Sequence, residues 1–325
     1  MDKQKDRFIR GAKNNGHTEE FAIDLFDQIE KFAGYSFNKS HASSYALLSY
    51  CTAFLKYYFP AEFYSAIMKY EILKSPKESD FNDYLAECYE KNLDVVTPDI
   101  NESGIDFSTN DGDIQYGLRS VKGVGSKAAK AIIDNRPYND FEDFVEKTSG
   151  KAVDKTTVEG LIKAGAFDTI NSNRKMLLNY YDFLNGNKDS NSMGMFTPKQ
   201  IVGDEETSEE DIVAYESEVL RAAITHPTEW DTTSSGDSIR LKGYLENVKE
   251  VKDKRGKLMA FADLKLEYHS IDLVIFGSTY GSNRHIIEDY SIVKVQGKKD
   301  GNSLLLDKIK EVDEEDLEFS LKGEE

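Results

Sequence analysis

The chain is poor in cysteine, and its cysteines fit neither a disulfide framework nor a metal site. Cys51 and Cys88 lie far apart in the 325-residue sequence, without histidine or cysteine neighbours at metal-ligand spacing. Small secreted domains usually carry several disulfides, and structural zinc sites need clustered nitrogen or sulfur ligands. The sequence therefore indicates neither feature, and we expect both thiols to be buried and inert.

Long hydrophobic runs are also missing from the chain. The mean hydropathy is −0.56, whereas a membrane-spanning helix needs about 20 consecutive, mostly apolar residues. The opening segment, MDKQKDRFIR, is charged and lacks the apolar stretch of a secretory signal peptide. We therefore expect no membrane span, no signal peptide and a cytoplasmic location.

Patterns of catalytic or metal-binding residues are absent as well. No HxH or HExxH pattern is formed by the five histidines, which are His17, His41, His226, His269 and His285. The acids in residues 110–113, Asn-Asp-Gly-Asp, resemble a metal-binding DxD, but this string is also what a tight hairpin turn requires. Two-metal chemistry needs several carboxylates that converge on the ions. We find no catalytic centre, and we predict no metal site and no cofactor bound by this chain.

The negative charge of the chain is concentrated in two segments. Residues 203–220 carry eight acids and no lysine or arginine, and residues 311–325 carry eight acids and one lysine. These segments account for −8 and −7 of the net charge of −18, which leaves −3 for the rest. The remainder is thus close to neutral, so the net charge does not exclude basic patches that contact nucleic acid.

Apolar periodicity predicts a multidomain α+β protein that begins with helices and ends with strands. A helix capped by Thr18 is expected at residues 18–34. Further helices are expected at 43–58, 60–68, 80–91, in several pieces over 126–185, and around 208–223. Short strands are expected at 95–96, 105–107 and 114–116, with a hairpin turn between the last two. Five further strands are predicted at 239–245, 259–266, 271–276, 292–297 and 304–309. Five strands of this size are typical of an OB-type β-barrel.

A glycine-rich turn at residues 121–125 is the clearest candidate for a phosphate contact. The segment VKGVGSKAAKAI has the hydrophobic-x-Gly-hydrophobic-Gly spacing of a helix-hairpin-helix. Gly123 and Gly125 permit a tight turn with bare backbone N–H groups at a helix N-terminus, which attracts a phosphate. The cations of this stretch are Arg119, Lys122, Lys127, Lys130 and Arg136. The alternative is an ordinary turn followed by a solvated helix face.

A second glycine-containing segment, residues 161–178, favours a structural interpretation. Gly165 is expected to end one helix, with Ala166 and Phe167 in the core, before another helix begins after Asp168 or Asn171. Arg174 and Lys175 are the residues of this segment that would meet a nucleic-acid backbone if the segment bound one.

The predicted barrel carries aromatic and basic residues on its first strands and loops. Single-stranded nucleic acid needs aromatic faces for its bases and cations for its phosphates. The candidates are Lys252, Lys254, Arg255 and Phe261, accompanied by Arg240, Lys242, Tyr244, Lys257 and Tyr268. The alternative is that the aromatic residues form the core and the lysines keep the barrel in solution, because alternation without the register does not separate inside from outside.

These patterns divide the chain into six parts. They are a compact helical segment (1–75), a small α/β connector with a β-hairpin (76–118), a helix-hairpin-helix region that binds duplex DNA (119–185), a linker with an acidic helix (186–236), an OB-fold (237–312) and an acidic tail (313–325).

Residues 32–68, FAGYSFNKSHASSYALLSYCTAFLKYYFPAEFYSAIM, closely resemble the fingers region of the alpha subunit of bacterial DNA polymerase III, a C-family replicative polymerase. The resemblance continues in family order through TPDINESGIDFS, YGLRSVKGVGSKAAKAI and LIKAGAFDTINSNRKMLL to a segment similar to the family's OB domain, LKGYLENVKEVKDKRGKLMAFADLKLE. It covers essentially the whole chain.

The resemblance implies a role for the polar and aromatic residues that precede the apolar run of residues 46–48. They would face the incoming nucleotide and the templating base: Lys39 would pair with a triphosphate oxygen, and Tyr45 would pack on a base or sugar. The remaining candidates of this set are Asn38, Ser40, His41 and Ser44. The alternative for each is a structural cap of the helix that follows.

The resemblance also implies what other chains would supply. The family's catalytic aspartates and their Mg²⁺ lie in a palm upstream of this region, so we expect a carboxy-terminal part of a nucleotidyltransferase, from a split gene or a cut chain, that acts only with a palm-bearing partner. Met195 and Phe196, in SMGMF, lie where the family docks on the sliding clamp, although Ser192 stands where the family often has Gln. The alternative for Met195 and Phe196 is that they pack on their own domain.

The partners implied are primer–template DNA, single-stranded DNA, the incoming dNTP, a palm-bearing polymerase chain and the sliding clamp. A different hypothesis is a stand-alone DNA-binding or replication scaffold protein without a polymerase role. A metabolic enzyme is a third hypothesis, which only the generic DxD supports.

Overall fold

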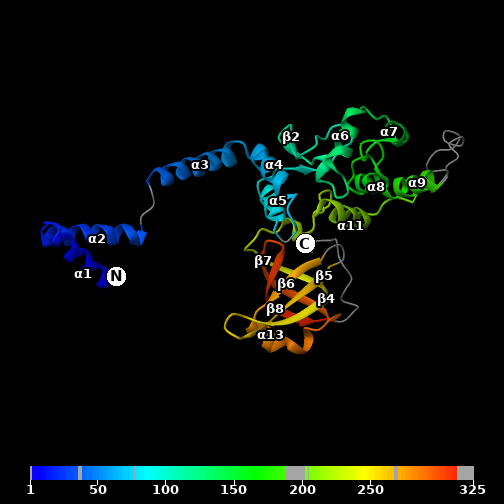
Figure 1. Ribbon diagram of the computed structural model, residues 1–325. Helices are drawn as coiled ribbons and strands as arrows, with labels where there is room; N and C mark the ends of the chain where they lie inside the picture. Colours follow the sequence, from blue (N-terminus) through cyan, green and yellow to red (C-terminus); the bar gives the residue numbers. More distant parts are fainter. Residues whose placement is uncertain are drawn as a thin grey trace. The chain divides into compact units, whose positions relative to one another are not determined.

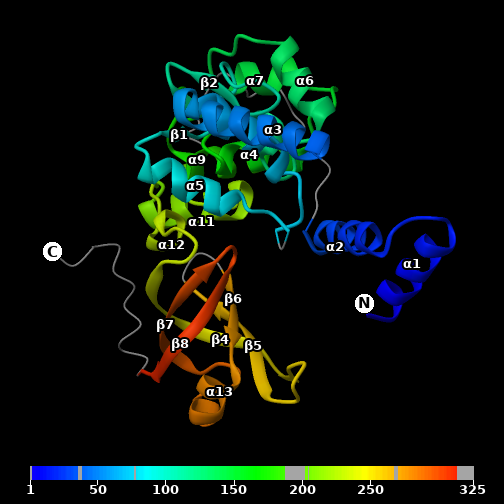
Figure 2. The same ribbon diagram turned by 90° about the vertical axis from the view of Figure 1, so that its left-hand side faces the viewer.

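The computed structural model describes residues 2–35, 39–76, 78–186, 202–203, 205–266 and 270–312. It divides the chain into two units, Met1–Phe59 and Pro60–Glu325, which we call the amino-terminal and carboxy-terminal units. Figures 1 and 2 show the elements of each unit from two directions. Among the helices that the structure describes, none has the length and the apolar character that crossing a bilayer would take.

The amino-terminal unit is helical. Helices α1 (Asp2–Asn14) and α2 (Glu19–Tyr35) pack against each other, with Ala22 and Phe26 buried between them. The predicted cap at the start of α2 is confirmed, because the hydroxyl of Thr18 accepts a hydrogen bond from the N–H of Phe21 at 3.3 Å.

Helix α3 (Lys39–Tyr58) differs from the prediction in its start and in its packing. It begins four residues before the expected start at Ser43, and the hydroxyls of Ser43 and Ser44 donate to the carbonyls of Lys39 and Ser40 within its first turns. None of the side chains of α3 is buried. The expected compactness is therefore wrong for this helix, and Cys51, on α3, is exposed rather than buried.

The carboxy-terminal unit begins with a group of elements that share one hydrophobic core, and we call this group the helical body. Its elements are α4 (Pro60–Glu71), α5 (Phe81–Glu90), β1 (Val95–Val96), β2 (Ser108–Asn110), β3 (Asp113–Gln115), η1 (Leu118–Ser120), α6 (Ser126–Asp134), α7 (Phe141–Thr148), α8 (Lys155–Lys163), α9 (Arg174–Gly186) and α11 (Glu209–Leu220). The core extends from Ala61 to Ile224 and includes Tyr64, Phe81 and Phe144.

This shared core groups the segments differently from the boundaries expected at residues 75, 118 and 185. Tyr64 and Met68 of α4 are completely buried with the elements that follow, so α4 packs with the carboxy-terminal unit. Val219 and Leu220 of α11, in the segment expected to be a linker, belong to the same core. Apolar periodicity identifies each helix, but it does not identify the partners of its apolar face.

A three-stranded sheet in the order β1-β3-β2 confirms the predicted hairpin. Asp111 and Gly112 form its two-residue turn with φ of 52° and 97°, which the Asp-Gly pair accommodates. The turn pairs Asn110 with Asp113 and Ser108 with Gln115. The strand expected at 105–107 is therefore wrong by a few residues, because the turn sets the register, and Phe107 lies in the core instead.

The last part of the unit is a closed barrel, as the sequence predicts. Its strands are β4 (Ser238–Lys252), β5 (Leu258–Lys265), β6 (Ser270–Ile275), β7 (Ile292–Asp300) and β8 (Ser303–Glu311), in the order β4-β5-β6-β8-β7. Helix α13 (Gly277–Asn283) lies between β6 and β7 in sequence and covers one end of the barrel (Figures 1 and 2). This five-stranded order, with a parallel β6–β8 pair, is an OB-type topology.

Polar contacts hold the barrel to the helical body. The amide of Asn302, in the β7–β8 turn, donates to the carbonyl of Ser79 at 3.0 Å and accepts from Asn82 at 3.0 Å. Lys299 is buried and donates to the carbonyls of Trp230 and Thr233 at 2.8 and 2.7 Å. Trp230 belongs to α12 (Glu229–Thr232), so this short helix is attached to β7.

Candidate nucleic-acid interface

The turn at residues 121–125 separates buried apolar side chains from exposed backbone. Val121 and Val124 are buried, whereas Lys122, Gly123 and Gly125 are exposed. Gly125 is the N-cap of α6 and offers no side-chain acceptor to the first turn of that helix. The positive end of α6 is thus directed to the surface, where an anion is favoured.

Helix α8 fixes the conformation of this turn. Gly123 has φ of 91°, and a methyl group at this position would meet the side chain of Thr156 at 3.0 Å. The hydroxyl of Thr157 donates to the carbonyl of Gly123 at 3.1 Å. Gly160 brings α8 so close that a methyl group there would lie 2.7 Å from the carbonyl of Lys122. The turn is therefore held by backbone contacts that need glycine.

Three of the predicted cations surround the turn at the surface. Lys122, Lys127 and Lys130 are exposed, while Ala128, Ala129 and Ile132 form the buried face of α6. Their charges are placed beside the helix N-terminus, so the turn can attract phosphate both through its amides and through its lysines.

Arg119 has a different environment from these lysines. Its guanidinium forms an ion pair with Asp106, which also pairs with Lys69 at 3.0 Å. Partial burial raises the pKa of Asp106, but the hydrogen bonds from Lys69 and Arg119 outweigh it, and the net pKa lies below its ordinary value. The charge of Arg119 is therefore partly compensated by the neighbouring carboxylate of Asp106. Lys69 is a neighbouring cation that sequence reasoning missed.

Arg136, at the end of the expected basic stretch, points into the protein. Its guanidinium donates to the carbonyls of Ile100 and Ser103, the latter at 2.6 Å. Burial lowers the pKa of this group. Its inclusion in a surface patch is wrong, because the backbone around residues 99–103 takes up its hydrogen bonds.

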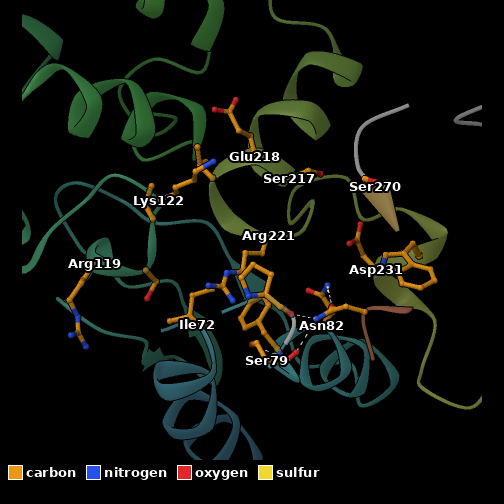
Figure 3. A pocket seen from close by; sticks show the side chains of 17 residues that line it. Ile72, Ser79, Asn82, Arg119, Lys122, Ser217, Glu218, Arg221, Asp231 and Ser270 are labelled. Carbon is orange, nitrogen blue, oxygen red and sulfur yellow. Dashed lines mark hydrogen bonds between the residues drawn. The ribbon is translucent and has the colours of Figure 1, made fainter. Parts of the chain in front are cut away.

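A pocket of about 560 Å³ borders the turn within the carboxy-terminal unit. Figure 3 shows Arg119 and Lys122 among its lining side chains, together with Arg221, which follows α11. The N–H of Lys122 donates to the carbonyl of Val219 at 2.9 Å, so the turn and the end of α11 are joined directly.

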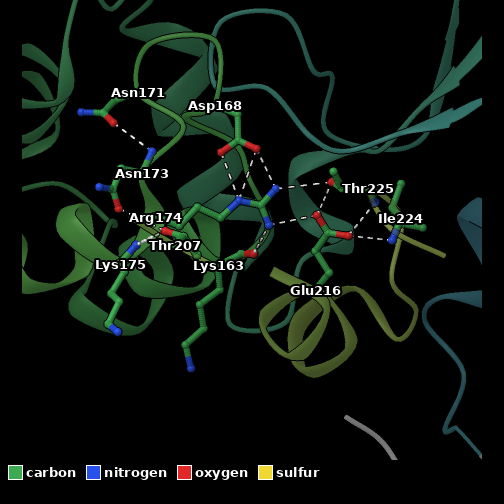
Figure 4. A network of polar contacts seen from close by, with 10 residues as sticks. All are labelled: Lys163, Asp168, Asn171, Asn173, Arg174, Lys175, Thr207, Glu216, Ile224 and Thr225. Carbon is green, nitrogen blue, oxygen red and sulfur yellow. Dashed lines mark hydrogen bonds and ion pairs between the residues drawn. The ribbon is translucent and has the colours of Figure 1, made fainter. Parts of the chain in front are cut away.

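A buried network anchors α11 beside the second glycine segment (Figure 4). The carboxylate of Glu216 pairs with Arg174 at 2.9 Å and accepts hydrogen bonds from the backbone N–H groups of Ile224 and Thr225 at 2.6 and 2.7 Å. Arg174 also pairs with Asp168 at 2.6 Å. Burial opposes the charge of Arg174, but the hydrogen bond to Asp168 prevails and raises its pKa.

This network decides the role of the second glycine segment. Gly165 has φ of 80°, and Ala166 and Phe167 are buried, as the structural interpretation expects. Arg174 is only 1% exposed, and Lys175 pairs with Glu205 at 2.5 Å. Arg174 is therefore a structural residue that a nucleic-acid backbone does not reach.

The predicted nucleotide-binding residues lie on the first turns of α3. Lys39, Ser40, His41, Ser44 and Tyr45 are all exposed there, and Asn38 lies outside the described residues. The rings of His41 and Tyr45 are 4.4 Å apart, as side chains four residues apart on a helix allow. The structure thus presents these residues on one exposed segment, and their nucleotide roles stay predictions.

The barrel presents its predicted cations on one turn. Lys252 ends β4, and Lys254 and Arg255 follow in a loop in which the carboxylate of Asp253 accepts hydrogen bonds from the N–H groups of Arg255 and Lys257, both at 2.8 Å. All three predicted cations are exposed.

Phe261 lies on the outer face of the barrel and is 44% exposed. Its register partner on β4 is the exposed Lys249, directly after a bulge at residues 246–249. A cation beside an outward aromatic ring is the arrangement that single strands require. Sequence reasoning missed Lys249, because the bulge changes which side of the strand faces outward.

Other predicted features lie elsewhere or outside the described residues. Met195 and Phe196, the clamp-docking candidates, are outside the part of the chain that the structure describes. Among the described residues, no group of three or more histidine, cysteine or acidic side chains is suited to hold a metal ion.

Comparison with known proteins supports the helix-hairpin-helix. Residues 92–177 match the family model described as a helix-hairpin-helix motif. The chain is 33% identical to the DNA polymerase III subunit alpha of Aquifex aeolicus over 91% of this chain and 27% of that protein. It is 31% identical to the same subunit of Thermus aquaticus over 94% of this chain and 28% of that protein. In Caulobacter vibrioides the identity is 39% over 57% of this chain and 16% of the subunit.

The fold and the comparisons define a class of protein in which a helix-hairpin-helix region precedes an OB-type barrel. The chain belongs to the family of the DNA polymerase III alpha subunits. It spans less than a third of the length of these relatives and corresponds to a part of such a subunit.

The first prediction concerns the anchor of α11. Replacing Glu216 by alanine leaves two backbone N–H groups and one side of Arg174 unpaired in the core, so we expect a loss of about 3 kcal/mol in unfolding free energy. Guanidinium titration followed by far-UV circular dichroism measures it. The matched control is Glu218→Ala, two residues away, whose carboxylate is half exposed and pairs with Lys163 at the surface. A Glu216→Ala protein as stable as this control would contradict the assignment.

The second prediction separates the two glycines of the turn. Gly123→Ala should reduce the unfolding free energy by about 1–3 kcal/mol, because alanine is strained at positive φ and contacts Thr156. Gly125→Ala should cost at most about 0.5 kcal/mol, since Gly125 has an extended backbone with open space around it and the poorer N-cap is partly offset by the lower entropy of the unfolded chain. Thermal unfolding of both variants tests this. Equal destabilisation of the two would show that the turn is held differently.

Proposed function

We propose that this chain is the part of a replicative DNA polymerase that holds primer–template DNA and the incoming nucleotide, and that a chain bearing the palm supplies catalysis. The observation that carries the proposal is the similarity to DNA polymerase III alpha subunits over nine-tenths of the chain. In this proposal the Mg²⁺ ions that the polymerase reaction needs are held by the palm.

The duplex would be gripped through its phosphates at the helix-hairpin-helix. The exposed turn 121–125 offers the N-terminal end of α6, and Lys122, Lys127 and Lys130 offer charge. Contacts of this kind position a duplex without reading its sequence. Sequence-independent grip is what a polymerase needs, because it copies every template.

The single-stranded template would pass along the barrel. Phe261 and Lys249 offer a stacking face and a cation on the outer wall, and the Lys252–Arg255 segment adds charge at the adjoining turn. Stacking of a base on an exposed aromatic ring contributes about 1–3 kcal/mol and tolerates every base.

The fingers role would fall to the start of α3. Lys39 is exposed and would pair with a triphosphate oxygen, and the ring of Tyr45, 58% exposed, would pack on a base or sugar. The hydroxyl of Ser44 donates to the carbonyl of Ser40 at 3.0 Å, so it would meet a nucleotide mainly as an acceptor. The sliding clamp would dock at Met195 and Phe196.

The remainder of α3 supports the need for a partner chain. Large apolar side chains are exposed along the whole helix, which lacks buried residues. These side chains are Leu47, Leu48, Tyr50, Phe54, Leu55, Tyr57 and Tyr58, between 41% and 76% exposed. A helix with apolar residues on several faces normally lies inside a larger assembly. We assign this surface to contact with the palm-bearing chain.

The third prediction tests the duplex grip. The double variant Lys122→Glu/Lys127→Glu should bind duplex DNA at least about tenfold more weakly and lower the slope of log affinity against log salt by about 2, because two phosphate contacts are lost. Fluorescence anisotropy at several salt concentrations measures both. The control Lys91→Glu/Lys308→Glu makes the same change in charge at exposed lysines on other elements of the same unit, after α5 and on β8. If both doubles weaken binding equally, the turn has no specific role.

The fourth prediction tests the partnership. Primer extension should occur when this chain is mixed with a palm-bearing polymerase chain, and neither should extend a primer efficiently by itself. Leu48→Glu should abolish the gain, since a charge would be buried in the contact, whereas Ser49→Glu, at the next exposed position, should keep more of it. Extension by this chain without a partner would reject the proposal. No gain on mixing, together with tight DNA binding, would favour a stand-alone DNA-binding protein.

A further inference from the structure

Unpartnered polar atoms gather around one pocket of the carboxy-terminal unit. Within the described residues, five buried side-chain polar atoms have no hydrogen-bond partner, and three of them belong to residues that line the pocket of about 560 Å³. These three are Asn82 Oδ1, Ser217 Oγ and Arg221 Nη1. Buried polar atoms are nearly always paired, so such a concentration calls for a group that is bound there.

Arg221 provides the charge of this pocket. It follows α11 with φ of 70°, a left-handed conformation in which helix ends usually carry glycine. Its Nη2 donates to the carbonyl of Lys74 at 2.7 Å, while no carboxylate lies within ion-pair distance in the described part of the chain. Burial without a counter-charge lowers its pKa. A partly buried cation in this state favours an anion.

The acids that line the pocket do not supply that anion. Glu218 pairs with Lys163 at 2.6 Å, and the carboxylate of Asp231 accepts hydrogen bonds from the N–H and hydroxyl of Thr228 at 3.0 and 2.6 Å. Exposed Lys122 adds a second positive charge at the rim. Figure 3 shows Arg221 projecting among the lining side chains.

The unpartnered atom of Asn82 is an acceptor, which favours a ligand that also carries a donor. The amide nitrogen of Asn302 donates to the carbonyl of Ser79 at 3.0 Å, so its oxygen is the atom that accepts from Asn82 at 3.0 Å. This fixes the orientation of the Asn82 amide and leaves its oxygen as an unfilled acceptor. An inorganic anion alone satisfies Arg221 and Ser217 but offers Asn82 little.

We propose that this pocket binds a nucleoside phosphate. The three atoms are covered in the structure, so the lining side chains turn toward the ligand when it binds. Its phosphate oxygens then accept from Arg221 Nη1 and from the hydroxyl of Ser217, and a sugar hydroxyl or base N–H donates to Asn82 Oδ1. The volume lies within the range of about 300–1,000 Å³ that is usual for small-ligand pockets. The same chemistry comes from a free nucleotide or from one unit of a DNA strand. This site is additional to the proposed polymerase contacts and does not depend on them.

Isothermal titration of the full chain with a deoxynucleoside monophosphate, with pyrophosphate and with a short single-stranded oligonucleotide tests the proposal. We expect saturable binding of the monophosphate and weaker binding of pyrophosphate, which has no sugar or base to donate to Asn82. If the oligonucleotide displaces the monophosphate, the site belongs to a DNA strand. If it does not, the site belongs to a free nucleotide. If neither the monophosphate nor the oligonucleotide binds in a manner that depends on Arg221, the proposal is overturned.

Variants of two residues define that dependence. Arg221→Gly removes the guanidinium at a backbone position that glycine prefers, so the fold should persist while affinity falls at least about tenfold. Arg221→Lys should restore part of the affinity. Ser217→Leu fills the pocket from a helical position and carries the test if Arg221→Gly does not fold. Arg10→Gln, at an exposed arginine of α1 that does not line the pocket, is the control and should bind normally. Undiminished binding by Arg221→Gly or by Ser217→Leu would refute the site.

Discussion

The buried carboxylate of Glu216 is the interaction on which the arrangement of the helical body depends. A charge in the core is tolerated only when it is paired and hydrogen-bonded, and Glu216 satisfies this with Arg174 and two backbone N–H groups. These contacts fix the end of α11. The carbonyl of Val219 then accepts a hydrogen bond from the N–H of Lys122, so the turn at residues 121–125 takes its position from an acid that is distant in sequence.

The same anchor explains how an acidic segment can lie beside a surface suited to phosphates. Of the eight acids in residues 203–220, Glu216 pairs with Arg174 in the core. Glu218 and Glu205 pair with Lys163 and Lys175. Opposite charges at short range dominate the local potential, because screening at physiological salt limits charge effects to about 8 Å. Glu205, Glu216 and Glu218 are thus compensated, and the lysines of the turn and of α6 meet a weaker negative potential than the acid count of this segment implies.

Much of the fold could be predicted because it depends on residues close in sequence. The cap at Thr18, the turn at residues 111–112 and the five barrel strands each follow from a local pattern. The partners of each element could not be predicted. The pairing of Arg119 with Asp106, the inward direction of Arg136 and the shared core that includes α4 all depend on contacts between distant segments, which periodicity does not contain.

The candidate sites show the same division for a physical reason. Glycine spacing identified the turn, since positive φ and close backbone approach restrict a position to glycine in any context. A cation carries no such restriction, because lysine is equally stable on any solvated surface and its role is set by its neighbours. Lys249 gains an aromatic neighbour only through the bulge in β4, and Arg221 gains a pocket only through the end of α11. Where backbone geometry limits the choice of residue, sequence alone identifies a site; where charge does the binding, the structure has to place the charge first.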